Sequence, residues 1–178
     1  MQIPKNQKFK FFYHKLFLII ACLSLSGCAV MNLLPPDPTI LKLTIVADQA
    51  VNPMPNQLSA PIQIRLYILR TQSLFTMTDP ETILQKEATI FGSDLLDKRV
   101  YVLAPGAKEV AEIKLPPEAY FVGVIGAFRE IDYSKGQRLI RIVPQKVKIL
   151  QLVAKGNAIT VEYPAVKLLE LPAGLPAL

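Results

Sequence analysis

The stretch Ile62-Gln63-Ile64-Arg65-Leu66-Tyr67-Ile68 decides the fold class. Its aliphatic residues recur at every second position, and a period of two places them on one face of a β-strand. A helix would need apolar residues every three or four positions. The stretch therefore predicts a strand with one buried face and one more polar face.

Seven further segments around this stretch carry strand signals. Turn signals separate them, among them Pro105-Gly106, which suits a type II turn, and Lys155-Gly156-Asn157, which suits a hairpin. Within one apolar run, Gly123 and Gly126 predict a bulge or a close backbone approach. Eight short strands at this spacing predict an all-β fold, a two-sheet β-sandwich. The seven segments are residues 41–45, 100–102, 110–115, 120–128, 139–143, 147–153 and 158–163.

A helical insertion interrupts the strands between the second and the third. The sequence Thr78-Asp79-Pro80-Glu81 matches a capping box, with Thr78 as the N-cap and Glu81 reaching back to it. Proline is tolerated in the first turn of a helix. We expect Ile83 and Leu84 to face the core, and a second short helical turn at residues 93–96.

The N-terminal residues have the features of an export signal. The run 16–25 is apolar but shorter than the roughly 20 residues that span a bilayer, so it suits a cleaved signal. Leu25-Ser26-Gly27-Cys28 then reads as a bacterial lipobox, which predicts a lipoprotein signal peptide over residues 1–27 and lipidation of Cys28. The alternative is a buried cysteine in an ordinary N-terminal helix. The run is preceded by a basic region of Lys5, Lys8, Lys10 and Lys15.

Removal of residues 1–27 changes the chemistry that the chain can offer. The net charge falls from +6 to +2 because four lysines and no acids leave, so we expect no nucleic-acid partner. His14 and Cys22 leave too, and Cys28 is consumed by lipid, so we expect no disulfide, metal or cofactor. The remaining 151 residues suffice for one domain with a core.

The carboxylates of the chain do not suggest an active site. A glycosidase needs two of them across one cleft, and nothing in their spacing brings a pair together, so we expect no enzymatic activity. Arg129 follows an apolar run beside Glu130 and Asp132, where a structural salt bridge or a hydrogen bond to a turn is the favoured interpretation. The scattered carboxylates are Asp94, Asp97, Glu109, Glu112 and Glu118.

The predicted sandwich lies between a proline-rich segment and a C-terminal tail. Residues 28–39 contain three prolines and are typical of an extended tether, with a reach of about 40 Å. We assign residues 40–163 to the sandwich and 164–178 to an apolar, proline-broken tail. Two alternatives stay open for the tail, which either packs along a sheet edge or does not pack at all.

The loop at residues 48–60 is the candidate binding site. Thirteen residues is long for a strand connection, since most have two to six. Prolines lower the entropy lost on docking, and methionine gives an adaptable apolar contact. We expect Val51, Met54 and Leu58 to be exposed; the alternative is a tolerated loop that tucks them into its own sheet. The candidate residues are Asp48, Val51, Asn52, Pro53, Met54, Pro55 and Leu58.

In order and spacing, several of these pieces resemble the type VI secretion lipoprotein family (TssJ/VasD). The most specific is Gly123-Val124-Ile125-Gly126-Ala127-Phe128-Arg129. One departure is Gln137-Arg138, at a place where the family often has tryptophan beside arginine. The other pieces are the lipobox, Val46-Ala47-Asp48, Val51-Asn52-Pro53, the run Arg65 to Leu69, Phe75, Gly92-Ser93-Asp94-Leu95-Leu96 and Pro105-Gly106.

The resemblance implies a transthyretin-like sandwich with a non-enzymatic role. Such a protein sits at the periplasmic face of the outer membrane and binds the periplasmic C-terminal region of a TssM/IcmF-like inner-membrane partner through its first loop. Alone, its soluble domain is expected to be a monomer. Ala29, rather than aspartate, after the lipidated cysteine fits outer-membrane sorting. Two alternatives are a lipid-anchored carrier of a small ligand and a pilotin-like assembly lipoprotein of another envelope machine.

Overall fold

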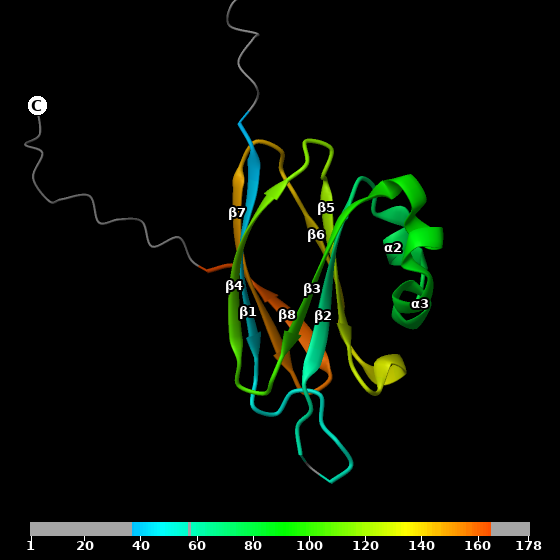
Figure 1. The fold of residues 1–178 in the computed structure, drawn as a ribbon, viewed down its shortest axis with the longest axis vertical. Coiled ribbons are helices and arrows are strands. Elements are labelled where there is room, and N and C mark those ends of the chain that lie inside the picture. The colour runs from blue at the N-terminus through cyan, green and yellow to red at the C-terminus, as the bar shows by residue number, and fades with distance from the viewer. Residues whose placement is uncertain (1–36, 57, 165–178) are drawn as a thin grey trace, which may run out of the picture. The chain divides into compact units, whose positions relative to one another are not determined.

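The computed structural model describes residues 37–56 and 58–164, which form a sandwich of two four-stranded sheets (Figure 1). The predicted signal peptide, Cys28, most of the tether and the tail after Pro164 lie outside these residues. None of the helices it describes is long and apolar enough to cross a membrane. The strands are β1 (Thr39–Ala47), β2 (Ile62–Leu69), β3 (Leu95–Leu103), β4 (Lys108–Leu115), β5 (Phe121–Ala127), β6 (Gln137–Arg141), β7 (Val147–Lys155) and β8 (Ala158–Glu162).

The eight strands confirm the predicted sandwich. One sheet has the order β4-β1-β7-β8 and the other β3-β2-β5-β6. All strand pairs are antiparallel except β1 with β7, which runs parallel over Ile40 to Ala47. The alternating residues of β1 and β2 meet in the core between the sheets, where each aliphatic side chain contributes about 1.5–3 kcal/mol. They are Leu41, Leu43, Ile45, Ile62, Ile64, Leu66 and Ile68, all at most 1% exposed.

A second, smaller core lies on the outer face of the β3-β2-β5-β6 sheet, under helices α2 (Ser73–Met77) and α3 (Pro80–Phe91) (Figure 1). Tyr67 points out of this sheet, and its ring centroid lies 5.4 Å from that of Phe91 and 6.3 Å from that of Phe75. Ile83 is buried and Leu84 is half-buried in the same cluster, as predicted. The core that they face is therefore separate from the one between the sheets.

The predicted insertion is confirmed between β2 and β3, but its start was placed one residue too early. The N-cap of α3 is Asp79, whose carboxylate accepts a hydrogen bond of 2.8 Å from the Thr82 amide. Thr78 instead ends α2, because its amide donates to Leu74 at 3.2 Å. The Glu81 side chain accepts from Gln85 rather than reaching back. The second helical turn is a 3-10 turn at Gly92–Asp94, after which Leu95 already begins β3.

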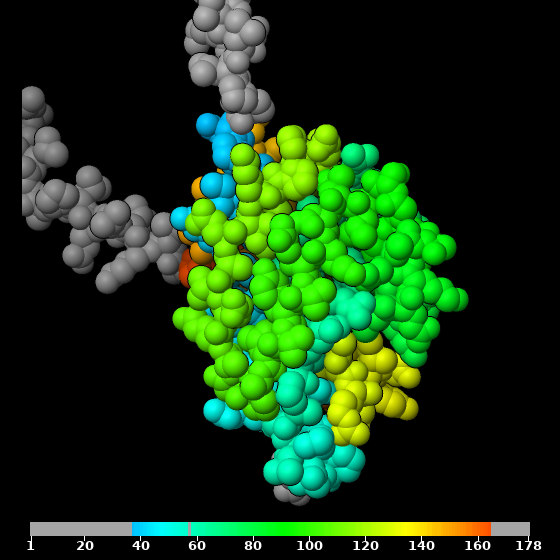
Figure 2. All heavy atoms as spheres, viewed as in Figure 1, coloured from blue at the N-terminus to red at the C-terminus, as the bar shows by residue number. Residues whose placement is uncertain are grey.

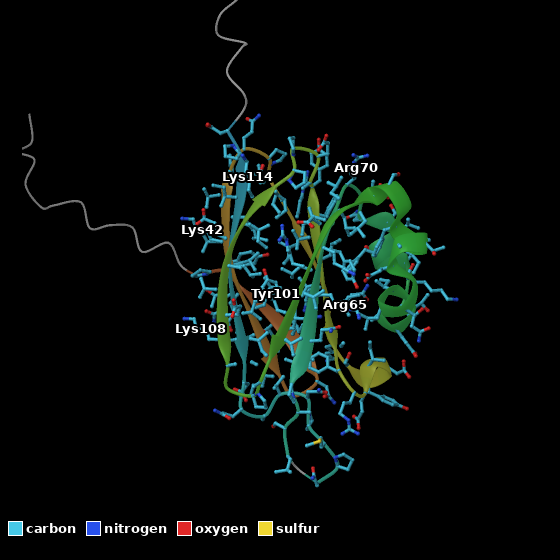
Figure 3. All side chains as sticks on the ribbon, viewed as in Figure 1. Lys42, Arg65, Arg70, Tyr101, Lys108 and Lys114 are labelled. Carbon is cyan, nitrogen blue, oxygen red and sulfur yellow. The ribbon has the colours of Figure 1, made fainter. Side chains whose placement is uncertain are left out.

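One half-buried carboxylate fastens α3 to the sheet. Glu87 accepts a hydrogen bond of 2.9 Å from the Tyr67 hydroxyl and lies 3.2 Å from the Arg65 guanidinium. Lys98 of β3 pairs with its other oxygen. Figure 3 shows Arg65 between β2 and the helices. Burial alone would raise the pKa of Glu87, but its three partners outweigh burial and lower it, while burial and Glu87 together raise the pKa of Tyr67.

Gly123 of β5 leaves the space that the second core needs. A Cβ at this position would overlap the ring of Phe75, which is only 1% exposed. At Gly126 a Cβ would lie 2.7 Å from Phe128 and 2.8 Å from Ile159. At both glycines the space is filled by side chains rather than by backbone, and the pairing of β5 with β2 has no register shift, so the predicted bulge or close backbone approach was wrong.

We predict that Glu87→Gln destabilises the fold at neutral pH by about 1.5–3 kcal/mol, because Arg65 and Lys98 lose a charged acceptor. Since the folded-state pKa of Glu87 lies below its ordinary value of 4.5, this stabilisation is complete above pH 4.5 and is lost as the pH falls through the folded-state pKa. Thermal unfolding of both proteins from pH 7 to pH 3 should show the gap closing in acid. Glu81→Gln on the exposed side of α3 is the control, and a constant gap would disprove the charge argument.

We predict that Gly123→Ala lowers stability by about 1–3 kcal/mol, because the new methyl group has to displace Phe75 in a filled core. A domain of this size loses about 2–4 °C of melting temperature per kcal/mol. Circular dichroism on heating measures this loss. Adding Phe75→Leu to Gly123→Ala should recover part of the lost stability. If the effects of the two substitutions on stability simply add, the two sites do not clash.

Candidate functional site

Four loops gather at the end of the sandwich where β1 finishes. The amide of Ala47 donates to Ala107 at 2.9 Å, and that of Asp48 donates to Ala154 at 2.8 Å, so the 104–107 turn and the 155–157 hairpin flank the first loop. The 128–136 loop joins them through Asn52, as described below. The chain enters β1 at the opposite end, where the Thr39 hydroxyl accepts from the Gln145 amide at 2.8 Å. These ends are the bottom and the top of Figure 1.

The base of the first loop belongs to the fold. The Asp48 carboxylate accepts from the Ala50 amide at 2.9 Å, and the Val51 amide donates to the Asp48 carbonyl at 3.1 Å, which turns the chain inward. Val51 is consequently 0% exposed and packs in the core between the sheets. Its predicted exposure was wrong, because this tight turn returns it to the sandwich.

The remainder of the loop projects as a small hairpin, whose described residues 53–56 and 58–59 we call the tip. Pro53 bridges to Ser59, and the Met54 amide donates to the Leu58 carbonyl at 2.8 Å. Pro53 and Pro55 are exposed, Leu58 is 59% exposed and Met54 is half-buried. The exposure predicted for Leu58 is confirmed, and the tip presents an apolar surface on a constrained backbone.

Asn52 joins the base to the tip and ties both to distant segments. Its side-chain amide donates to the Pro61 carbonyl at 2.8 Å, and its side-chain oxygen accepts from the Arg129 amide at 2.9 Å. Its backbone amide donates to Gly156 at 2.9 Å. It is 3% exposed and adopts φ +48°, a conformation that asparagine tolerates better than most residues. The structure therefore gives the Asn52 side chain an internal role.

The neighbouring segment of residues 129–135 was not among the predicted site residues. It contains a 3-10 turn at Ile131–Tyr133, and the Lys135 amide donates to the Asn157 carbonyl at 2.8 Å. Tyr133 is 87% exposed, more than any other large hydrophobic residue that the structure describes. An aromatic residue in a polar turn before Gly136 is the signal that sequence reasoning could have used. Figure 2 shows this segment beside the tip on one face.

Arg129, the first residue of this segment, and Gln137, just after it, have structural contacts. The hydrogen bond of Arg129 comes from its backbone amide, and its guanidinium forms no ion pair within the described ranges. Gln137, which stands where the related family often has tryptophan, donates to the Phe75 carbonyl at 2.6 Å. The departure at Gln137 thus places a polar tie between β6 and the helical insertion.

Several of the scattered carboxylates make local contacts instead of forming a shared cleft. Asp94 accepts from the Thr71 hydroxyl at 2.7 Å, Asp97 pairs with Arg99 at 2.8 Å, and Glu112 lies 3.6 Å from Lys42. Over residues 37–56 and 58–164, no three histidine, cysteine or acidic side chains are placed to hold a metal ion. A hollow beside the start of α3 is lined by acidic and basic side chains, including Asp79, Glu81, Lys135 and Arg138.

Comparison with known proteins identifies similar folds and a matching family. A search of curated proteins found no match. The fold is similar to the type VI secretion lipoprotein TssJ1 from Pseudomonas aeruginosa, with 23% identity over 72% of this chain and 96% of that chain and a TM-score of 0.65. It is also similar to Serratia marcescens Lip, a membrane-bound component of the type VI secretion system, with 21% identity over 69% and 96% and a TM-score of 0.63.

A third similar chain comes from a structure of the TssM C-terminal domain (869–1107) from EAEC, with 20% identity over 69% of this chain and 97% of that chain and a TM-score of 0.58. The model of the type VI secretion lipoprotein family, which names VasD, EvfM and TssJ, matches residues 39–162. That match runs from the first residue of β1 to the last residue of β8. The chain therefore belongs to the type VI secretion lipoprotein family, a structural component of that secretion system.

Proposed function

We propose that this chain is an outer-membrane lipoprotein that holds the periplasmic C-terminal region of a TssM/IcmF-like inner-membrane protein. The observation that carries the proposal is the exposed tip, which leaves the sandwich at the end opposite the entry of the chain into β1. A lipid at Cys28 and a partner at the tip would then act on opposite ends of one rigid domain.

The partner is supported by the match to a chain in a structure of the TssM C-terminal domain. The alignment covers 69% of this chain and 97% of the matched chain, so the matched chain is shorter than this one. It is only about half as long as the fragment 869–1107. We infer that the matched chain accompanies the TssM fragment, and that the protein proposed here has a partner of the same kind.

The anchor is supported by the sequence before β1. Cys28 follows Leu25-Ser26-Gly27, and Ala29 lacks the acidic group associated with inner-membrane retention. Only ten residues separate Cys28 from Thr39, the first residue of β1. This tether would keep the domain within about 40 Å of the bilayer surface.

The tip has the properties of a docking element. Leu58 and the two prolines are exposed, and the bridge between Pro53 and Ser59 already orders their backbone. Little conformational entropy is then lost when a partner covers them. Binding energy in such interfaces comes mainly from a few apolar side chains that become fully buried.

We predict that Cys28→Ala releases the chain from the membrane, because the acyl chains supply nearly all of its membrane affinity. Fractionation of cells that express each protein, with separation of inner and outer membranes, measures the effect. The unchanged protein should sediment with outer membrane and the variant should stay soluble. Cys22→Ala, in the signal, is the control. A variant that still sediments with outer membrane would show that the lipobox is not the anchor.

We predict that replacing Pro53, Met54, Pro55 and Leu58 by glycine and serine weakens partner binding by about one to two orders of magnitude. Each buried apolar side chain is worth about 1.5–3 kcal/mol, and about 1.4 kcal/mol is tenfold in affinity. The replacement leaves Val51 and Asn52 in place because both belong to the fold. Calorimetry with the periplasmic region of the partner measures the affinity, and circular dichroism checks the fold.

The matched control for the tip replaces exposed apolar residues elsewhere. Val147 and Ile149 lie on the outer face of β7 and are 54% and 47% exposed. Val147→Ser with Ile149→Ser removes comparable apolar surface away from the tip. If the tip and control variants bind equally well, the partner site lies elsewhere and the proposed docking element is wrong.

A further inference from the structure

We propose that the partner-binding surface is composite, with Tyr133 as its second anchor and Asn52 as the positioning residue that holds Tyr133's segment against the tip. This inference rests on the proposed function and extends it. It adds residues 129–135 to the surface that the partner covers. Asn52 then affects the affinity for the partner indirectly, without touching the partner.

The tip alone is too small to be the whole site. Stable protein interfaces bury about 800 Å² on each partner and involve some 20–30 residues a side. The tip has six described residues, and Met54 is already half-buried. A partner that binds the tip must therefore also cover neighbouring surface. Its affinity will depend on a neighbouring segment whose position relative to the tip is fixed.

Residues 129–135 meet that requirement through Asn52. The side-chain oxygen of Asn52 accepts from the Arg129 amide at 2.9 Å, and the next residue along the chain is Pro53 of the tip. The Ala60 amide donates to the Asn52 carbonyl at 3.1 Å, which closes the base of the tip. A single buried residue thus joins the two segments, although 77 positions separate Asn52 from Arg129.

A second set of contacts fixes the far end of the segment. The Lys135 amide donates to Asn157 at 2.8 Å, and the Ile159 amide donates to Lys135 at 3.0 Å. The Asn157 side chain also donates to Glu130 at 3.3 Å. With both ends held by the sandwich, the 3-10 turn between them presents Tyr133 from an ordered backbone.

Tyr133 has the chemistry of an interface anchor. Its ring is 87% exposed, and nothing in the fold described above depends on its side chain. Tyrosine is enriched among the residues that dominate binding energy, since it brings a large apolar area and a polar hydroxyl at little entropic cost. Figure 2 shows its segment next to the tip, so one partner surface can cover both.

The test compares four single variants of the full-length lipidated chain in detergent. The probe is the purified periplasmic C-terminal region of the TssM/IcmF-like protein from the same organism. Tyr133→Ala removes the anchor. Asn52→Gly removes both side-chain hydrogen bonds but keeps a residue that adopts φ +48° without strain. Affinity comes from calorimetry, and melting temperature is measured for each variant.

The controls lie at the opposite end of the sandwich. Thr39 is the other buried polar residue that the structure describes, at 4% exposure, and Thr39→Val removes its hydrogen bond with Gln145. Tyr120 precedes β5 and is 46% exposed, so Tyr120→Ala matches the loss of an exposed ring. Thr39→Val separates a general loss of stability from an effect on the partner surface.

We expect Tyr133→Ala and Asn52→Gly each to weaken binding about tenfold, with the controls within about twofold. The double variant should bind less than 100-fold more weakly, because Asn52→Gly already misplaces Tyr133. If Tyr133→Ala binds normally while the glycine-serine tip does not, the composite surface is wrong and the tip proposal stands. If neither Tyr133→Ala nor the glycine-serine tip alters binding, both the composite surface and the tip proposal fail. Should Asn52→Gly not fold, Tyr133→Ala alone decides, since its ring is exposed.

Discussion

The burial of β2 on both of its faces is the constraint on which the rest of the structure depends. Its inward residues form the core between the sheets, but Tyr67 and Leu69 point outward and are equally inaccessible to water. A two-sheet sandwich covers only one face of each sheet, so the outward residues need a further layer. The chain supplies it directly after β2 with α2 and α3, and Glu87 adds a charged contact at the border of that layer.

The parts of the fold that were predictable from sequence are those with a local period. The alternation in β1 and β2 and the turn residues at Pro105-Gly106 depend on neighbours in the sequence, and the structure has all of them. Helix α2 was not predictable in this way, since its five residues carry no helical period and it is held by Phe75 packing on Tyr67 and Phe91. Its position depends on the space left by Gly123, 48 residues later in the chain.

The candidate site shows the same division. The length and prolines of residues 48–60 marked the loop, and its exposed tip agrees with that interpretation. The division between buried base and projecting tip could not be read from composition, because Val51 and Leu58 are both aliphatic residues in one polar loop. What separates them is the Asp48 turn and the contacts of Asn52 with Pro61, Arg129 and Gly156. Those contacts join three segments that are remote in sequence, so no local pattern reports them.

The position of β1 also determines how the domain bears mechanical load. The strand begins at Thr39 and the first loop leaves it after Ala47, so a pull applied between these two ends would act along its length. The strand is hydrogen-bonded to β4 on one side and β7 on the other over eight residue pairs each. Because the two ladders lie across the direction of pull, their bonds are loaded in shear and must break together, whereas an edge hairpin would unzip one pair at a time. A force applied between the two ends of β1 would therefore be resisted by both ladders at once.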